Sequence, residues 1–242
     1  MTEPNLGKLR ALPPSRLTPE AVDPAKPLRA VRLPSLTTLS AESRSADQQR
    51  LTRLPTLPSE ARQLKVLDFD IENRPLSYGG GDWTTAEVTA IAAGWIGEEE
   101  VHCWALGQDS ATTMFREFKR LYDEADIVTG HNIRKHDLPI LNGAMMEVGL
   151  PFLTPKLSSD TYGDLLRRGD ISGSQESLAG IYGVAASKYH MSQPMWRQAN
   201  RLTPEGVLLT RKRVIDDVIQ HKALRAKLIE AGALKPPKTW NP

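Results

Sequence analysis

Residues 64–72 read Leu-Lys-Val-Leu-Asp-Phe-Asp-Ile-Glu, and this stretch decides the fold. Apolar and polar side chains alternate along it, as is typical of a β-strand with one buried face. Asn-Arg-Pro at 73–75 and three glycines at 79–81 then predict a loop. Two more β-rich stretches, 88–96 and 101–106, follow, so the three together predict an antiparallel meander.

Helices and further strands are expected after the meander. Apolar residues recur at spacings of three and four over 114–122, which predicts a helix. A short strand is expected at 126–129, and further helices at 138–148, 162–168, 176–182 and 204–231. This order predicts an α/β fold, a mixed sheet flanked by helices, and is compatible with a ribonuclease-H-like arrangement.

The chain divides into unequal parts. Residues 1–60 hold nine of the 18 prolines and one glycine, and the first aromatic residue of the chain is Phe69. We therefore expect a mostly disordered, Pro-rich arm over 1–61, one domain over 62–235, and a fraying C-terminal tail over 236–242. The arm repeats Arg-Leu-Pro-x-Leu at 32–36 and 53–57. Biased composition explains this repeat; the alternative is a pair of docking peptides for a partner protein.

Bulk composition limits the classes of function. Net charge is only +2, and the single cysteine, Cys103, excludes a disulfide framework within the chain and a zinc site of cysteine pairs. About 18 consecutive apolar residues, which a membrane span requires, occur nowhere. We expect a soluble, cytoplasmic protein with no membrane partner.

Asp70 and Glu72 are the first candidate site. Residues i and i+2 of a strand point to the same face, so the two carboxylates project side by side. Their mutual repulsion favours a bound cation, and hard divalent ions such as Mg²⁺ or Mn²⁺ prefer oxygen ligands. The alternative is an ordinary solvated strand face.

Two later acids extend this candidate site. Asp137 ends the segment Gly-His-Asn-Ile-Arg-Lys-His-Asp at 130–137, near an expected helix start, where it could equally be an ordinary first-turn acid. Asp217 lies among apolar residues of the last helix, and a buried acid needs a partner. A metal is one candidate partner; a salt bridge to Arg213, four residues earlier, is the other.

Together these segments resemble the DEDD (DnaQ-like) 3′–5′ exonuclease superfamily, most of all the exonuclease domains of family-B DNA polymerases and their stand-alone relatives. The resemblance is carried by Phe-Asp-Ile-Glu at 69–72, Gly-His-Asn-Ile-x-x-x-Asp-Leu-Pro at 130–139 and Asp-Val at 217–218, in that order. It implies a ribonuclease-H-like fold. It also implies four metal-ligating carboxylates: Asp70, Glu72, Asp137 and Asp217.

The resemblance further implies a reaction. Two Mg²⁺ or Mn²⁺ ions would assist hydrolysis of the 3′-terminal phosphodiester of single-stranded DNA, releasing nucleoside monophosphates. Asn132 would contact the substrate strand or position the site. His131, Arg134, Lys188 and Trp196 are expected substrate-binding residues, with Trp196 stacking on a base; a core or lid tryptophan is the alternative.

This chain departs from the family pattern in the last helix. The family supplies a Tyr four residues before the last Asp, or a His five before it, to orient the attacking water; here those positions hold Arg213 and Lys212. Neither is an ordinary general base at neutral pH. His221 is a candidate replacement, unless it is a surface histidine, and His131 and His136 are rivals. Asp160 either supports the site or caps a helix.

Two kinds of function follow. The first is an active exonuclease for proofreading, repair or recombination. The second is a nucleic-acid-binding or scaffolding module whose nuclease centre is impaired. A third possibility, a structure-selective endonuclease, would differ from both by cutting circular single-stranded DNA.

Overall fold

The computed structural model describes residues 62–75, 86–166, 169, 171–185 and 189–242. The expected arm over 1–61, its two repeated segments and the glycines at 79–81 therefore lie outside the described residues.

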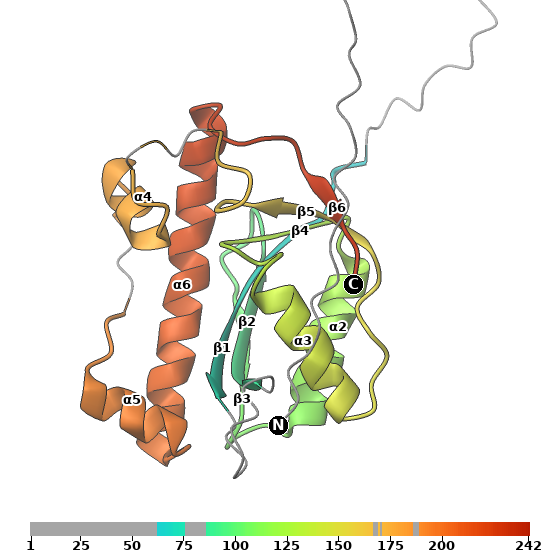
Figure 1. The fold of residues 1–242 in the computed structure, drawn as a ribbon, viewed down its shortest axis with the longest axis vertical. Coiled ribbons are helices and arrows are strands. Elements are labelled where there is room, and N and C mark those ends of the chain that lie inside the picture. Colours follow the sequence, from blue (N-terminus) through green and yellow to red (C-terminus); the bar gives the residue numbers. More distant parts are fainter. Residues whose placement is uncertain (1–61, 76–85, 167–168, 170, 186–188) are drawn as a thin grey trace, which may run out of the picture. The chain divides into compact units, whose positions relative to one another are not determined.

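One mixed sheet of six strands organises the domain (Figure 1). Its strand order is β3-β2-β1-β4-β5-β6. The first three strands form the expected antiparallel meander, β4 and β5 continue the sheet in parallel with β1, and β6 pairs antiparallel with β5. The strands are β1 (Val66–Pro75), β2 (Ala86–Trp95), β3 (His102–Ala105), β4 (Ile127–Gly130), β5 (Lys156–Asp160) and β6 (Lys238–Trp240).

Helices cover both faces of the sheet, which confirms the predicted α/β class. Helices α2 and α3 lie on one face and the long helix α6 on the other, with α4 and α5 beside α6 (Figure 1). Within the described residues, no helix is long and apolar enough to cross a membrane. The helices are α2 (Ala111–Glu124), α3 (Asp137–Glu147), α4 (Gln175–Ile181), α5 (Gln193–Asn200) and α6 (Pro204–Glu230).

The alternation along β1 separates an apolar face from an acidic one. Leu67, Phe69 and Ile71 are buried in the main core, which contains the inner sides of α2 and α3. Because neighbouring residues of a strand point to opposite faces, Asp68, Asp70 and Glu72 are directed toward α6. The predicted half-buried strand therefore has both faces covered, one by apolar side chains and one by a helix that carries polar partners.

Small residues on β2 let α6 approach the acidic face of β1. The strand register pairs Glu72 with Ala90, Asp70 with Ala92 and Asp68 with Gly94. Ala90 and Ala92 pack in a second core against Val214 and Val218 of α6. A Cβ on Gly94 would lie 2.5 Å from Nζ of Lys222. Larger side chains along this line would push α6 away from the three acids.

The helix predicted at 162–168 is wrong for its described part. Residues 161–166 form turns instead. The carboxylate of Asp160 accepts hydrogen bonds from the backbone amides of Tyr162 and Gly163, and Leu165 forms an isolated bridge with Leu234. These contacts hold the backbone in a turn, so the apolar residues of this stretch pack without a helix.

The expectation that the C-terminal tail frays is also wrong. Lys238–Trp240 form β6, which pairs with β5, and Trp240 is buried against the main core. The prolines at 236 and 237 precede this edge strand, where a missing N–H costs no ladder hydrogen bond. Residues 238–240 of the tail are therefore part of the sheet.

Candidate active site

Three carboxylates meet between β1 and α6. Asp70, Glu72 and Asp217 each offer an oxygen, and these oxygens lie within 4.8 Å of one another. Asp217 is buried, and the two β1 acids are partly buried. Three carboxylate oxygens at this separation fit one hard divalent cation such as Mg²⁺ or Mn²⁺, which would also offset their mutual repulsion.

The meeting follows from two matched spacings. Alternate residues of a strand are separated by about 6.6 Å, and residues four apart on a helix by about 6 Å. Asp68, Asp70 and Glu72 therefore face a row of residues on α6 that runs in the opposite direction: His221, Asp217 and Arg213. Because the two spacings are nearly equal, one position of α6 along β1 places all three facing pairs in contact.

Asp137 lies outside this group of three. Its Oδ1 accepts a hydrogen bond from the backbone N–H of Ile71, at 3.2 Å, so its carboxylate is attached to β1 between Asp70 and Glu72. Asp137 is buried in the first turn of α3, where the helix dipole favours an acid. Its hydrogen bond with His136 raises the pKa of that histidine. Asp137 therefore lies beside the cluster without belonging to it, and its role as a fourth metal ligand stays a prediction.

Arg213 contacts two of the three clustered acids. Its Nε donates to Oε1 of Glu72 at 2.6 Å, and its guanidinium lies 3.7 Å from Oδ2 of Asp217. The carbonyl of Tyr189 and the ring of Trp196, 5.0 Å away, hold the other side of the guanidinium. The salt bridge considered for Asp217 is therefore present, within the carboxylate cluster.

Lys212 turns away from the cluster. Its ammonium pairs with Asp216 at 2.8 Å and lies over the ring of Tyr189. Of these two neighbouring cations, only Arg213 contacts the carboxylates of Glu72 and Asp217.

His221 is buried one turn beyond Asp217. Its Nδ1 lies 2.7 Å from Oδ2 of Asp68, and its Nε2 lies 2.8 Å from Oγ1 of Thr161. A surface histidine, one of the two readings of the sequence, is wrong, because only 2% of His221 is exposed. Asp68 was missed, although the alternation that identified Asp70 and Glu72 places Asp68 on the same face.

Thr161 connects this pair to the loop after β4. Nδ1 of His131 lies 2.9 Å from Oγ1 of Thr161, and the His131 ring meets Tyr162 edge-on. The adjacent Asn132 adopts a left-handed backbone conformation with φ of 67°, which an asparagine tolerates better than most residues. His131 and Asn132 are thus held by neighbours beyond their own loop.

Asp160 organises the same loop. Its carboxylate accepts backbone N–H groups of Asn132 and Arg134 at 2.9 and 3.1 Å, in addition to those of its own turn. Asp160 therefore connects the turn after β5 to the loop after β4, and its support of the site stays a prediction. Arg134 is directed to β5 and the turn after it, where it bonds Ser158 and the buried carboxylate of Asp164. These contacts occupy a guanidinium that the sequence assigned to the substrate.

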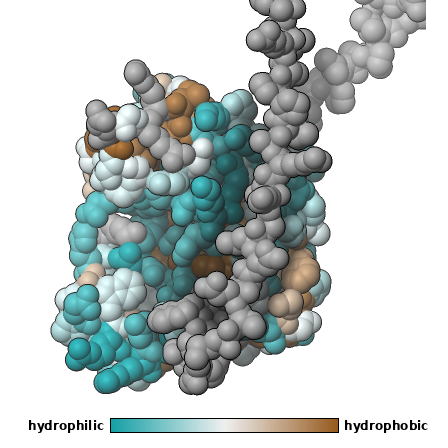
Figure 2. Space-filling view, in the orientation of Figure 1, coloured by the Kyte–Doolittle hydropathy of each residue, from teal (hydrophilic) through white to brown (hydrophobic). Residues whose placement is uncertain are grey.

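A cavity of about 280 Å³ lies on α5 near Arg213. Trp196 lines this cavity, and its ring also packs on the Arg213 guanidinium. The visible surface over α5 is hydrophilic (Figure 2). Lys188, another expected groove residue, lies outside the described residues. The cavity is lined by Gln193, Trp196, Arg197, Asn200 and Arg201.

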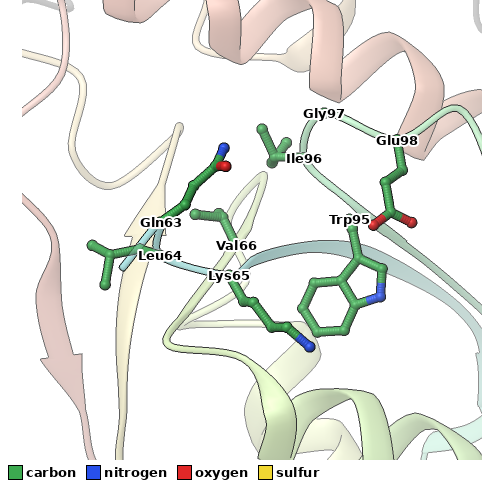
Figure 3. A pocket seen from close by; sticks show the side chains of 8 residues that line it. All are labelled: Gln63, Leu64, Lys65, Val66, Trp95, Ile96, Gly97 and Glu98. Carbon is green, nitrogen blue, oxygen red and sulfur yellow. The ribbon is translucent and has the colours of Figure 1, made fainter. Parts of the chain in front are cut away.

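Two other cavities lie away from the carboxylates. The larger, of about 380 Å³, lies at the start of β1 and the end of β2, where Lys65 lies beside Trp95 (Figure 3). A smaller one, of about 240 Å³, is lined in part by Asn132, Lys135 and Tyr162. Neither is lined by Asp70, Glu72 or Asp217.

Comparison with solved structures identifies the fold. Part of the family B DNA polymerase from the hyperthermophilic archaeon Pyrobaculum calidifontis superposes with a TM-score of 0.53 at 19% sequence identity. The match covers 69% of this chain and 25% of the polymerase chain, so this chain corresponds to about a quarter of that protein. No family model and no curated protein matches the sequence. The chain thus shares its fold with part of a nucleic-acid-processing enzyme.

Proposed function

We propose that this chain is a metal-dependent nuclease that removes nucleotides from the 3′ end of single-stranded DNA. One observation carries the proposal: Asp70, Glu72 and Asp217 converge within 4.8 Å in a fold shared with part of a DNA polymerase. Carboxylates on a strand and a facing helix are well suited to hold a cation against a phosphodiester, because both elements are rigid.

The positions of the acidic residues suggest a role for each in metal binding. Asp70, Glu72 and Asp217 would hold a Mg²⁺ or Mn²⁺ ion, and Asp137, attached beside them, would contribute to a second. Bound ions would lower the pKa of the attacking water and offset charge on the phosphate. The buried Asp68–His221 pair would keep α6 in register with β1, so that Asp217 stays opposite Asp70.

The substrate strand would pass the loop after β4 and the cavity on α5. His131 and Asn132 lie at the C-terminal end of β4, and His131 and His136 are both candidates to orient the water. Trp196 offers a ring for base stacking, and Arg197 and Arg201 are exposed cations for the phosphates. His221 is the weaker water-orienting candidate, because Asp68 and Thr161 occupy both of its ring nitrogens.

The contacts of Arg213 favour a second candidate function. A guanidinium beside Glu72 and Asp217 supplies positive charge to the cluster from within the protein. If Arg213 is the only positive charge that offsets these acids and no metal binds, the chain would be a nucleic-acid-binding module without catalysis.

Protein partners of the 1–61 arm remain a separate prediction. Comparing the proteins bound by the full chain with those bound by a chain lacking residues 1–61 would test it.

A labelled oligonucleotide assay decides between these functions. The wild-type chain should shorten 5′-labelled single-stranded DNA to a ladder from the 3′ end in Mg²⁺ or Mn²⁺, and a matched RNA would show which nucleic acid is preferred. Asp217→Asn should abolish the ladder, whereas Asp216→Asn, the adjacent acid that pairs with Lys212, should retain it.

The other outcomes have distinct meanings. Cutting of circular single-stranded DNA would indicate an endonuclease. No degradation of DNA or RNA with either metal, together with retained binding of the oligonucleotide, would support the binding module and contradict the proposed exonuclease.

A further inference from the structure

Arg213 lies where a positive charge is needed to compensate the clustered carboxylates. It contacts Glu72 and Asp217, two of the three acids whose oxygens cluster within 4.8 Å. The arginine side chain is itself mostly buried, with 17% of it exposed. A buried carboxylate requires compensation of its charge, and a guanidinium that donates hydrogen bonds to it supplies that compensation.

The surroundings of Arg213 hold it in this position. One guanidinium nitrogen donates to the Tyr189 carbonyl at 3.0 Å, and the ring of Trp196 covers one side of the group at 5.0 Å. The bond to Glu72, at 2.6 Å, is short for a charge-assisted hydrogen bond. Arg213 is therefore a built-in feature of the cluster, with partners on α6, on β1, at Tyr189 and on α5.

A divalent ion and this guanidinium would share the carboxylates of Glu72 and Asp217. The Glu72 oxygen that accepts from Arg213 has lone pairs directed at the arginine, and a second positive charge placed beside it would be repelled by the guanidinium. We propose that Arg213 is an internal competitor of the metal ion, which must displace it from Glu72 and Asp217 to bind fully. This inference rests on the proposed metal-dependent function.

The competition has a consequence for the displaced side chain. The guanidinium already lies 5.0 Å from the ring of Trp196, which also lines the cavity on α5. A released arginine there would be available to a phosphate of the substrate, for which its planar donor pairs are suited. Metal binding would thus convert Arg213 from a ligand of the protein's own acids into a ligand of nucleic acid.

Direct measurement of Mn²⁺ binding tests the inference without relying on activity. Electron paramagnetic resonance of free Mn²⁺ gives the dissociation constant for the full chain. Arg213→Gln should bind Mn²⁺ roughly tenfold more tightly than wild type, within the range by which groups around metal ligands alter affinity. Arg213→Lys, which keeps the charge, should remain near the wild-type value. Lys212→Gln removes the same charge from the neighbouring position and should change the constant by less than about twofold.

Two further variants keep the test decisive. Arg213→Met retains an apolar chain over Trp196, so it replaces Arg213→Gln if thermal unfolding shows that the glutamine variant is not folded. Asp70→Asn should remove the Mn²⁺ site from wild type and from the Arg213 variants alike.

Equal or weaker Mn²⁺ binding in folded Arg213→Gln, or in Arg213→Met where the glutamine variant does not fold, would overturn the inference. So would no binding by wild type or by these two variants up to millimolar Mn²⁺. The proposed function is judged separately by the ladder assay. Wild type that degrades DNA while Arg213→Gln leaves the affinity unchanged would overturn the competition and leave the nuclease intact.

Discussion

Nδ1 of His221 lies 2.7 Å from Oδ2 of Asp68, and both side chains are almost completely buried between α6 and β1. The pair joins the long helix to the central strand one helical turn from Asp217 and one strand repeat from Asp70. It therefore fixes the position of α6 along β1, and with it the placement of Asp217 opposite Asp70. A buried pair of this kind is costly to break, because the remaining partner is left buried without its hydrogen bond.

His221→Ala should lower the free energy of unfolding by roughly 3 kcal/mol, because it leaves Asp68 buried without its partner. Urea denaturation of the full chain measures the change. His190→Ala is the matched control, since His190 also pairs with a carboxylate, Glu176, but is 71% exposed. It should change stability by less than about 0.5 kcal/mol. Equal effects of the two substitutions would contradict the anchoring role of His221.

Gly130→Ala should destabilise the loop that carries His131 and Asn132. A Cβ at Gly130 would overlap the side chain of Ile133 and lie 2.7 Å from the carbonyl oxygen of Phe69, which the sheet holds in place. We expect a loss of about 1–3 kcal/mol, as for other overpacked interior positions. Gly143→Ala on α3 meets no atom within 4 Å and should be neutral or stabilising. Chemical denaturation of both variants is the measurement. A Gly130→Ala protein with the stability of wild type would contradict the close packing of Gly130 against Ile133 and the Phe69 carbonyl.

Trp240→Ala should cost about 3 kcal/mol of stability, since it removes a large buried ring from the core. Thr239→Ala, an exposed position on the same strand, should stay within about 0.5 kcal/mol of wild type. Thermal and urea unfolding would show the difference. Similar curves for both variants would mean that β6 contributes no more than a frayed tail.

Cys103 should react slowly with alkylating reagents in the folded chain. Burial raises the pKa of its thiol to about 11, so at pH 8 only about a thousandth of it is thiolate, the reactive form. Its rate with iodoacetamide should rise steadily from pH 8 to pH 10 and remain well below that of the urea-unfolded chain at each pH. Mass spectrometry measures the modification. Identical rates in the folded and unfolded chains would contradict the burial.

The strand that opens the domain shows what sequence can predict. Period-two alternation placed Asp70 and Glu72 on one face, and a buried acid in an apolar helix identified Asp217; the structure brings these three together. The same alternation includes Asp68, but its partner His221 is 153 residues away, and local pattern gives no information about such a distant contact.

Other elements depend on neighbours that the local sequence does not reveal. β5 reads Lys-Leu-Ser-Ser-Asp, with one apolar residue, and is a strand because β4 and β6 pair with it. α5 was missed because it is short and mostly polar. Arg213 stands out in the sequence as a cation four residues before Asp217, but the contact of its guanidinium with Glu72 depends on how α6 is placed against β1.

Release of the 3′-terminal nucleotide tests the central claim most directly. Single-stranded DNA carrying a label in its last nucleotide should lose that label as a nucleoside monophosphate when wild-type protein and Mn²⁺ are present, and chelation of the metal should stop the release. Asp70→Asn should slow it by more than the roughly 10–100-fold that loss of an outer-shell group costs a metal site. Release at an equal rate by Asp70→Asn, or no release by the wild-type chain with either metal, would contradict a nuclease centre at Asp70, Glu72 and Asp217.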